Sequence, residues 1–582
     1  MTDPHAGAPA HLLTDVELSV PHAIAKVLVE AGIDVVFGMP GGLMMHVYDA
    51  LHDRADSIRA LLVRQESIAT IMADVYGRLT GRPGVAIGQG AWMLGSAGTG
   101  TLEAFLSGSP MLILTEMTDG SPYSHHAPYQ SGTGEWGSWD ARTSFSGITK
   151  QTVVVHDGAQ AVHAVQAGIK QARAGHPGPV AILFHSRALQ STVGPSTRPR
   201  LYETAPYLTN GRPLPDPEAI DRGARMLARG RAVAIAGNGV WLSGAFDALR
   251  RFAEETGIPV ATTAKGKSAI PETHPLALGV MGPFGTALAN RAIAEADVIL
   301  AVGTKLGASD TANENPELID PLRQRLVQID VEPLHAAWTY PAHQIVADAG
   351  EALRRLSDVL SNDDAVARRR DDAPHTLAAH RADVGYFNDP ALSSDAVPIL
   401  PQRVIAEIQR AATADTVVTC DAGENRIFMT HFFQSKAAGS FIQPAGVGGM
   451  GYAIPAALGV KALRPDAPVV AVCGDGGFGM SFAAMMTAIE ERLPIVVVVF
   501  NNSVLGWVKH EQGTRVIAAD LTQFDHAAVA RALGWNGIRI EHPADLAGAL
   551  SGAIADTERP TLLDVITSAA ETYLTVQSPL AS

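Results

Sequence analysis

A short glycine-rich turn late in the chain carries residues that could hold a metal ion together with a phosphate group. The apolar stretch APVVAVC runs directly into Gly-Asp-Gly-Gly at residues 474–477, and the next apolar stretch, IVVVVF, leads into Asn501 and Asn502. Carboxylate and amide oxygens suit Mg²⁺, and glycines let backbone N–H groups approach a phosphate at a helix N-terminus. Because strands one βαβ unit apart end at the same sheet edge, we expect Asp475 and Asn502 to lie side by side.

The order of these features resembles the thiamine-diphosphate enzyme superfamily, in particular acetolactate synthases and 2-oxo-acid decarboxylases. A Gly-Asp-Gly triplet alone is an ordinary strand-to-helix turn, whereas the triplet, a helix-length segment and a strand ending in Asn-Asn form a specific pattern. The resemblance implies that Asp475 and Asn502 bind Mg²⁺ by their side chains and Val504 by its carbonyl oxygen. It also implies contacts to the diphosphate from three glycines, Gly474, Gly476 and Gly477.

Two segments before this motif extend the resemblance. Gly423, Glu424 and Asn425 follow the apolar run TVVTCDA, where the family places diphosphate contacts. The stretch QPAGVGGMGYAIPAALG resembles the family's next segment. There Gly448 would offer its carbonyl to the aminopyrimidine amine, and Met450 would be the apolar wedge that bends the cofactor. Plain core packing is the alternative role for Met450.

A thiamine enzyme also needs a carboxyl group beside the pyrimidine ring, because the cofactor's 4′-amino group removes the C2 proton only after ring nitrogen N1′ is protonated. Glu66 is the candidate, since it follows an apolar run and begins ESIATIMADVYGRLTG, whose apolar residues recur with the period of a helix. A lone Glu there is more often a partner of the helix dipole. However, residues 37–42 resemble the family's FGxPGG loop, which implies that Pro40 and Gly41 contact the cofactor.

The elements that must position these residues are predicted from alternating apolar runs and helix-length amphipathic segments. Two stretches, 187–216 and 362–401, read as linkers and divide the chain into three pieces. We therefore predict an α/β protein of three tandem doubly wound parallel-sheet domains. Their expected bounds are 12–190 for the pyrimidine-binding domain, 205–360 for the central Rossmann-like domain, and 385–575 for the diphosphate- and Mg²⁺-binding domain.

Composition narrows the class of protein. The chain has 582 residues, 47% of them apolar, and a formal net charge of −15, which disfavours nucleic acid and anionic membranes as partners. Only two cysteines are present, so neither a disulfide framework nor a thiolate metal cluster is expected. The longest apolar stretch is too short to span a bilayer. These features predict a cytoplasmic enzyme.

The sequence indicates the substrate less clearly than it indicates the cofactor. His125 and His126 follow Glu66 at about the distance at which pyruvate-decarboxylase-like enzymes carry a proton-relaying His–His pair. A solvated surface pair is the alternative. Where acetolactate synthases have an SGPG loop, this chain reads GQGAWM at residues 88–93. The expected substrate pocket contains Gln89, Trp92, Gln130, Leu505 and Trp507.

The central domain departs from acetolactate synthases, which hold FAD partly with an Arg-Phe-Asp-Asp-Arg run. Residues 303–310 read GTKLGASD instead, which argues against FAD. The main hypothesis is acetolactate-synthase-like decarboxylation of a 2-oxo acid, after which the enamine is protonated or joined to a second carbonyl compound. A 2-hydroxyacyl-CoA lyase or oxalyl-CoA decarboxylase, acting on an acyl-CoA, and a catalytically silent regulatory paralogue remain alternatives. The family pattern implies a homodimer as the smallest active unit, with a homotetramer expected.

Overall fold

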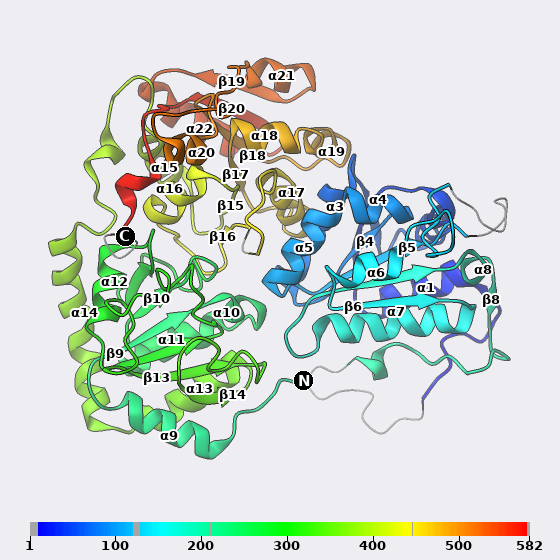
Figure 1. Cartoon of the computed structure of the whole chain (residues 1–582), viewed down its shortest axis with the longest axis horizontal. Coiled ribbons are helices and arrows are strands. Elements are labelled where there is room, and N and C mark those ends of the chain that lie inside the picture. The colour runs from blue at the N-terminus through cyan, green and yellow to red at the C-terminus, as the bar shows by residue number, and fades with distance from the viewer. Residues whose placement is uncertain (1–9, 120–128, 209–210, 445, 579–582) are drawn as a thin grey trace. The chain divides into compact units, whose positions relative to one another are not determined.

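The computed structural model describes residues 10–119, 129–208, 211–444 and 446–578, and divides into two compact units, Met1–Gly211 and Arg212–Ser582 (Figure 1). The described residues form three six-stranded sheets, one in the first unit and two in the second. Every strand pair within these three sheets is parallel. This confirms the predicted fold class of tandem parallel-sheet α/β domains.

The sheet of the first unit has the strand order β3-β2-β4-β5-β7-β6. Its strands are β2 (Val35–Gly38), β3 (Arg59–Leu62), β4 (Gly84–Ile87), β5 (Met111–Glu116), β6 (Gln151–Val155) and β7 (Pro179–Phe184). Helices α1 (Val20–Glu30), α2 (Met45–His52) and α7 (Gly158–Arg173) share one apolar core with it. Helix α3 (Glu66–Thr80) packs on β2 and β4, and α5 (Gly98–Ser107) packs on α3. Side chains alternate along a strand, and the four inner strands β2, β4, β5 and β7 are buried along their whole length, so both faces of the sheet are covered there.

The central sheet of the second unit has the order β11-β10-β9-β12-β13-β14. Its strands are β9 (Ala232–Ala236), β10 (Val260–Thr262), β11 (Ala277–Val280), β12 (Val298–Val302), β13 (Arg325–Asp330) and β14 (His343–Val346). Helices α9 (Pro217–Leu227), α11 (Phe246–Thr256) and α13 (Ala349–Leu360) pack on one another beside it. The sequence order therefore reverses between β9 and β12, the point at which open α/β sheets commonly bind ligands.

The C-terminal sheet of the second unit has the order β16-β15-β17-β18-β20-β19. Its strands are β15 (Val417–Cys420), β16 (Phe441–Ile442), β17 (Val469–Gly474), β18 (Val496–Asn501), β19 (Asn536–Ile540) and β20 (Thr561–Ile566). One core joins it to α15 (Pro401–Ala411), α16 (Glu424–Phe432) and α22 (Leu546–Ala555). Helix α17 (Ala453–Leu463) packs on β15 and β17. Strands β17 and β18, which carry the predicted metal motif, are thus central in this sheet.

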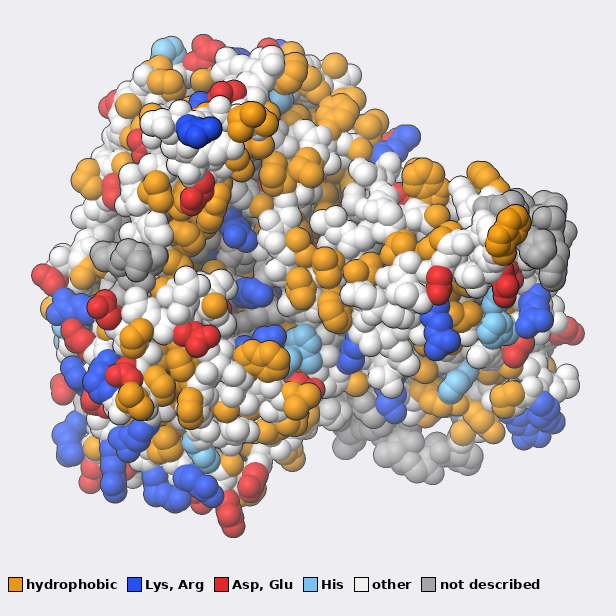
Figure 2. Space-filling model, viewed as in Figure 1, with side chains coloured by type: hydrophobic (Ala, Val, Ile, Leu, Met, Phe, Trp, Pro, Cys, Tyr) orange, Lys and Arg blue, Asp and Glu red, His pale blue; other side chains and the backbone are white. Residues whose placement is uncertain are grey.

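The stretch 362–401, expected as a loop-rich linker, instead contains the 21-residue helix α14 (Asp364–Val384). Asp363 caps its N-terminus, and Gly385 ends it in the left-handed conformation. The charged run hid this helix because most of its length is exposed, with only Val366 and Leu377 buried. Arg369 fixes the helix to the central domain by donating to the Thr256 and Leu227 carbonyls. Figure 2 shows basic and acidic side chains intermixed over this part of the surface, at the lower left.

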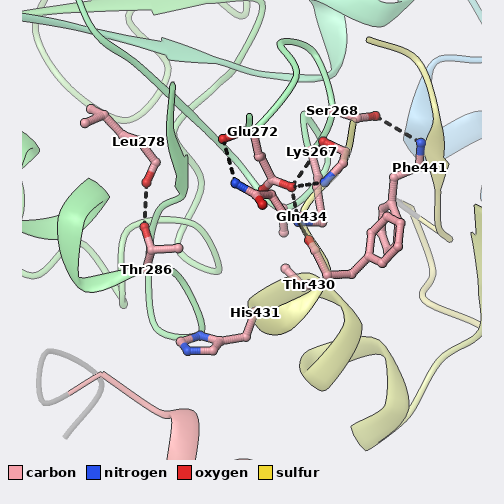
Figure 3. Close-up of polar contacts among 12 residues, drawn as sticks. Lys267, Ser268, Glu272, Leu278, Thr286, Thr430, His431, Gln434 and Phe441 are labelled. Atoms are coloured by element: carbon pink, nitrogen blue, oxygen red, sulfur yellow. Dashed lines mark hydrogen bonds and ion pairs between the residues drawn. The ribbon is translucent and has the colours of Figure 1, made fainter. Parts of the chain in front are cut away.

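A buried ion pair joins the central and C-terminal domains within the second unit (Figure 3). Lys267 and Glu272 are essentially inaccessible, and Lys267 Nζ lies 2.7 and 2.8 Å from the two Glu272 oxygens. The same ammonium group donates to the Phe433 carbonyl, and Glu272 accepts from the backbone N–H of Ser435. Every charge is therefore paired, as burial requires. The pair anchors the chain just after α16, the helix that begins at the predicted diphosphate contacts.

No helix in the described ranges is both long enough and apolar enough to cross a bilayer.

Candidate active site

Asp475 lies where strand β17 ends and helix α18 (Asp475–Ser481) begins. Its side chain is held from two directions: Oδ1 accepts from the backbone N–H of Gly476 at 2.8 Å, and Oδ2 accepts from that of Ser503 at 2.6 Å. Burial raises the pKa of this carboxyl, although both N–H donors oppose the shift. Since Ser503 follows Asn502, the ends of β17 and β18 meet as the sequence predicted.

Asn502 and Val504 complete the predicted ligand set on the loop after β18. Asn502 Oδ1 accepts from the backbone N–H of Val504 at 3.2 Å, and Val504 also pairs with Asp520 in a short antiparallel bridge. Asp475, Asn502 and Val504 line one cavity of about 130 Å³. The other predicted residues that line this cavity are Gly423, Glu424, Asn425, Met450, Gly474, Gly476, Gly477, Leu505 and Trp507. The structure thus gathers nearly all the predicted residues of the third domain at one site.

The glycines of this cavity are required by close packing. A Cβ on Gly476 would stand 3.0 Å from both Met450 Cε and Leu505 Cδ2, so these two side chains close over the turn. A Cβ on Gly477 would stand 1.9 Å from Asp421 Oδ2. The cavity offers a carboxylate and an amide oxygen, which fit Mg²⁺. It also offers a glycine backbone at a helix N-terminus, which fits a diphosphate. The alternative that Met450 is ordinary core is not favoured, because its side chain is 36% exposed.

Asp421 is a site residue that the sequence analysis missed. It follows strand β15, is fully buried, and accepts from the backbone N–H groups of Gly451 at 3.0 Å and Tyr452 at 2.8 Å. Burial raises its pKa to about 6. The carboxyl group therefore holds the loop after Met450 against Gly477. An acid directly after the apolar run TVVTC was the available signal, since such strand ends face the ligand edge of a parallel sheet.

Glu424 is held by partners that the sequence did not indicate. Its Oε1 atom lies 2.6 Å from His510 Nδ1 and accepts from the backbone N–H of Tyr573 at 3.0 Å. His510 Nε2 also lies 3.2 Å from the Ala569 carbonyl, so both nitrogens of this partly buried imidazole have partners. Glu424 thus ties helix α20 (Gly506–Gln512) and the C-terminal segment to the edge of the cavity.

Asn425 and Gly448 lie on the two segments expected to flank the cofactor. Asn425 Nδ2 donates to the Asp421 carbonyl at 3.3 Å, and its side chain lies in the cavity lining. Gly448 adopts a φ of +72°, and a Cβ there would stand 2.9 Å from Arg426 Nη1. The left-handed backbone and this close approach both favour glycine at position 448.

An aromatic cluster stands beside the cavity mouth. The Trp507 and Tyr573 rings stack with centroids 4.4 Å apart and an interplanar angle of 8°. Phe284, from the central domain, meets both rings edge-on at 5.8 and 5.9 Å. Trp507 and Leu505 both line the cavity, and their contact with a substrate stays a prediction.

In the first unit, Glu66 is the first residue of α3 and only 5% exposed. A Cβ on Gly88 would stand 3.7 Å from Glu66 Cγ, so the acid lies against the turn that follows β4. The turn also meets the FGMPGG loop, because a Cβ on Gly41 would stand 2.9 Å from Gln89 Oε1. Pro40 precedes this contact. Glu66 and the two predicted loops therefore share one edge of the sheet.

The predicted catalytic and substrate residues of the first unit differ in what the structure shows of them. Gln89 Nε2 donates to Gln130 Oε1, which joins two of them. Trp92 lies on α4 (Gly90–Gly95) with 52% of its surface exposed. His125 and His126 lie outside the described residues.

Glu116 is a second buried acid that the sequence analysis missed. It is the last residue of β5 and 3% exposed, and burial raises its pKa to about 7. It ends the apolar run MLILTE at residues 111–116, and this acid at a strand end was the available signal.

Comparisons with known proteins agree with this geometry. The chain matches three family models: the N-terminal TPP binding domain of thiamine pyrophosphate enzymes at residues 18–133, their central domain at 220–356, and their C-terminal TPP binding domain at 421–565. It is 32% identical to a probable acetolactate synthase large subunit of Methanocaldococcus jannaschii, over 94% of this chain and 92% of that one. It is 30% identical to the acetolactate synthase isozyme 3 large subunit of Escherichia coli K12, over 94% of each. The chain therefore belongs to the thiamine pyrophosphate enzyme family.

Proposed function

We propose that this protein is an acetolactate-synthase-like enzyme that decarboxylates a 2-oxo acid and then either protonates the product or joins it to a second carbonyl compound. The observation that carries the proposal is the cavity in which Asp475, Asn502 and Val504 meet a bare glycine turn. The names of the relatives support the choice among thiamine-dependent reactions.

Each part of the chain would have a separate task. Asp475, Asn502 and the Val504 carbonyl would hold Mg²⁺, and Gly474, Gly476 and Gly477 would let the diphosphate approach the backbone. Glu66 would hold a proton beside the pyrimidine ring. Bound thiamine diphosphate supplies a carbon nucleophile for the substrate carbonyl and an electron sink for decarboxylation. Leu505, Trp507 and Met450 would keep water from the reacting atoms.

We further propose that the enzyme works without FAD. Where the strand order of the central sheet reverses, the turns after β9 and β12 pack backbone to backbone. A Cβ on Gly237 would stand 2.5 Å from the Gly303 carbonyl oxygen, and one on Gly239 would stand 2.6 Å from Gly303 Cα. This tight crossing, together with the missing arginines, supports the proposal. Its check is full turnover by protein whose visible spectrum has no flavin bands.

The activity is tested by carbon dioxide release from pyruvate and longer 2-oxo acids with thiamine diphosphate and Mg²⁺. We expect turnover of at least one acid, and loss of turnover in Glu66→Gln by about 10²- to 10⁴-fold, the usual contribution of general acid–base catalysis. Exchange of the cofactor's C2 proton, followed by NMR, should fall in parallel. A panel without turnover would refute the proposed reaction, and tight CoA binding would then favour a CoA lyase.

A mixing experiment tests whether each site takes Glu66 from one subunit and Asp475 from another. Glu66→Gln and Asp475→Asn chains are each expected to be inactive. A heterodimer of the two would contain one site with both native residues, so random reassembly should restore about a quarter of wild-type activity. Complementation would support the shared-site homodimer. Failure of a verified heterodimer to regain activity would place both residues of each site on one subunit.

A further inference from the structure

Glu116 is a buried acid without an assigned role. Among the described residues, its Oε1 atom has no hydrogen-bond partner, although the side chain is almost wholly inaccessible. Leaving a buried carboxyl oxygen unpaired costs free energy, so such a group in a folded protein calls for an explanation. Acids of this kind gather at functional sites more often than in ordinary cores.

Two glycines approach Glu116 closely, one at its carboxyl group and one at its backbone. A Cβ on Gly42, which has a φ of +51°, would stand 1.7 Å from Glu116 Oε1. A Cβ on Gly90 would stand 2.6 Å from the Glu116 carbonyl oxygen. The FGMPGG loop and the turn after β4 therefore both use glycine at their closest approach to this residue.

Glu116 and Glu66 lie at the same edge of the same sheet. Glu66 follows β3, Glu116 ends β5, and β4 is the direct neighbour of β5. The turn after β4 approaches both residues: Gly88 lies near the Glu66 side chain, and Gly90 lies near the backbone carbonyl of Glu116, whose carboxyl group lies against Gly42. The carboxyl ends of parallel strands are where ligands bind in open sheets. Two buried acids at that edge of one sheet form an arrangement suited to two separate proton transfers.

The pKa of Glu116 suits a proton-transfer role. Burial is the main cause of its raised pKa of about 7, and the nearby Asp119 adds to it, whereas the backbone N–H of Leu43 opposes it. Asp119 is itself paired with His185 and accepts from the backbone N–H of Ser186. A group with a pKa near the working pH can both donate and accept a proton.

We propose that Glu116 is a second acid–base residue, acting on the substrate rather than on the cofactor; this rests on the function proposed above. As the substrate carbonyl carbon forms its new bond, the π electrons move to the carbonyl oxygen, which takes the proton of Glu116 and leaves a carboxylate. When the product carbonyl re-forms, the hydroxyl proton returns to Glu116. The residue thus ends each turnover in its starting state.

The test compares Glu116→Gln, which keeps the shape but cannot exchange the proton, with Glu116→Asp and with the exposed-residue control Asp56→Asn. The substrate is the 2-oxo acid that the wild type decarboxylates fastest. We expect Glu116→Gln to lower kcat by about 10²-fold or more and to remove the limb of the kcat/KM pH profile near pH 7, and Glu116→Asp to regain part of kcat. Asp56→Asn should match the wild type.

Two readouts separate this role from a structural one. Thiamine diphosphate affinity, from tryptophan fluorescence quenching, and C2 proton exchange should stay within a few-fold of wild type in Glu116→Gln. In the cofactor-free protein, the infrared difference spectrum should show loss of a protonated carboxyl band. An unchanged kcat and pH profile would overturn the proposal, as would a loss of cofactor binding equal to the loss of kcat. A wild type that exchanges the C2 proton but decarboxylates no 2-oxo acid would overturn the proposed function, and this role with it.

Discussion

Asp421 and Gly477 approach so closely that a side chain at position 477 would collide with the carboxylate: a Cβ there would stand 1.9 Å from Asp421 Oδ2. The same carboxyl group accepts from the backbone of residues 451 and 452. It therefore joins the glycine turn after β17 to the loop that carries Met450. Because the buried acid cannot swing aside without losing those hydrogen bonds, it fixes the position of the turn relative to the loop.

The variant Gly477→Ala tests whether the close contact with Asp421 constrains the site. We expect it to lower the free energy of unfolding by about 1–3 kcal/mol, as overpacking does, and to weaken thiamine diphosphate binding. Gly479 is the matched control, because it lies in the same helix and a Cβ there meets nothing within 4 Å. Urea unfolding and cofactor titration measure both effects. Equal behaviour of the two alanine variants would show that the Asp421 contact does not constrain the site.

Asp475→Asn tests the metal-binding role. The amide keeps the size of the side chain but removes its charge, so Mg²⁺-dependent binding of thiamine diphosphate should weaken by at least about 100-fold, the upper range for losses around a metal. EDTA should have a similar effect on the wild type. The exposed Asp415→Asn is the control for a simple change in net charge. Cofactor binding that is insensitive to both EDTA and Asp475→Asn would contradict the assigned ligand set.

The sequence predicted the central strands better than the edges of the sheets. Runs such as IVVVVF and PVAILF are buried on both faces and cannot be mistaken for surface segments. Strands β6, β14 and β19 were not predicted, and each lies at a sheet edge and keeps partly exposed residues. The buried strands β10, β11 and β16 were also not predicted, and each is only two to four residues long. Helix α14 was missed because its charged length gives little apolar periodicity.

The residues of the candidate site also differ in whether the sequence could predict them. Asp475 and Asn502 could be placed from sequence because strand ends one βαβ unit apart must be neighbours, and the structure brings their loops together. Asp421, Glu116 and the His510–Glu424 contact could not, since each depends on which loop packs against which strand end. Such contacts join residues 30 to 86 positions apart, and no local pattern records them.

Lys267→Met tests the ion pair that joins the central and C-terminal domains. Removing the ammonium group leaves the Glu272 carboxylate buried without its partner, so the free energy of unfolding should fall by about 3–5 kcal/mol. The exposed pair Arg250–Glu254 is the control, and Arg250→Met should cost less than about 1 kcal/mol. Chemical denaturation provides the measurement. If the two variants lost similar stability, the buried pair would not be a structural anchor.

Glu116 should make stability depend on pH in a defined direction. Its pKa is about 7 in the folded chain against an ordinary 4.5, so the folded state holds the proton more tightly than the unfolded state does. The stabilisation is fully present below about pH 4.5 and is lost as the pH rises towards 7. At about 1.4 kcal/mol per pKa unit, the wild type should lose about 3 kcal/mol relative to Glu116→Gln across that window. Urea midpoints of the two cofactor-free proteins, compared at several pH values, measure the difference. A difference that stays constant from pH 4.5 to 7 would mean that Glu116 titrates as an ordinary glutamate.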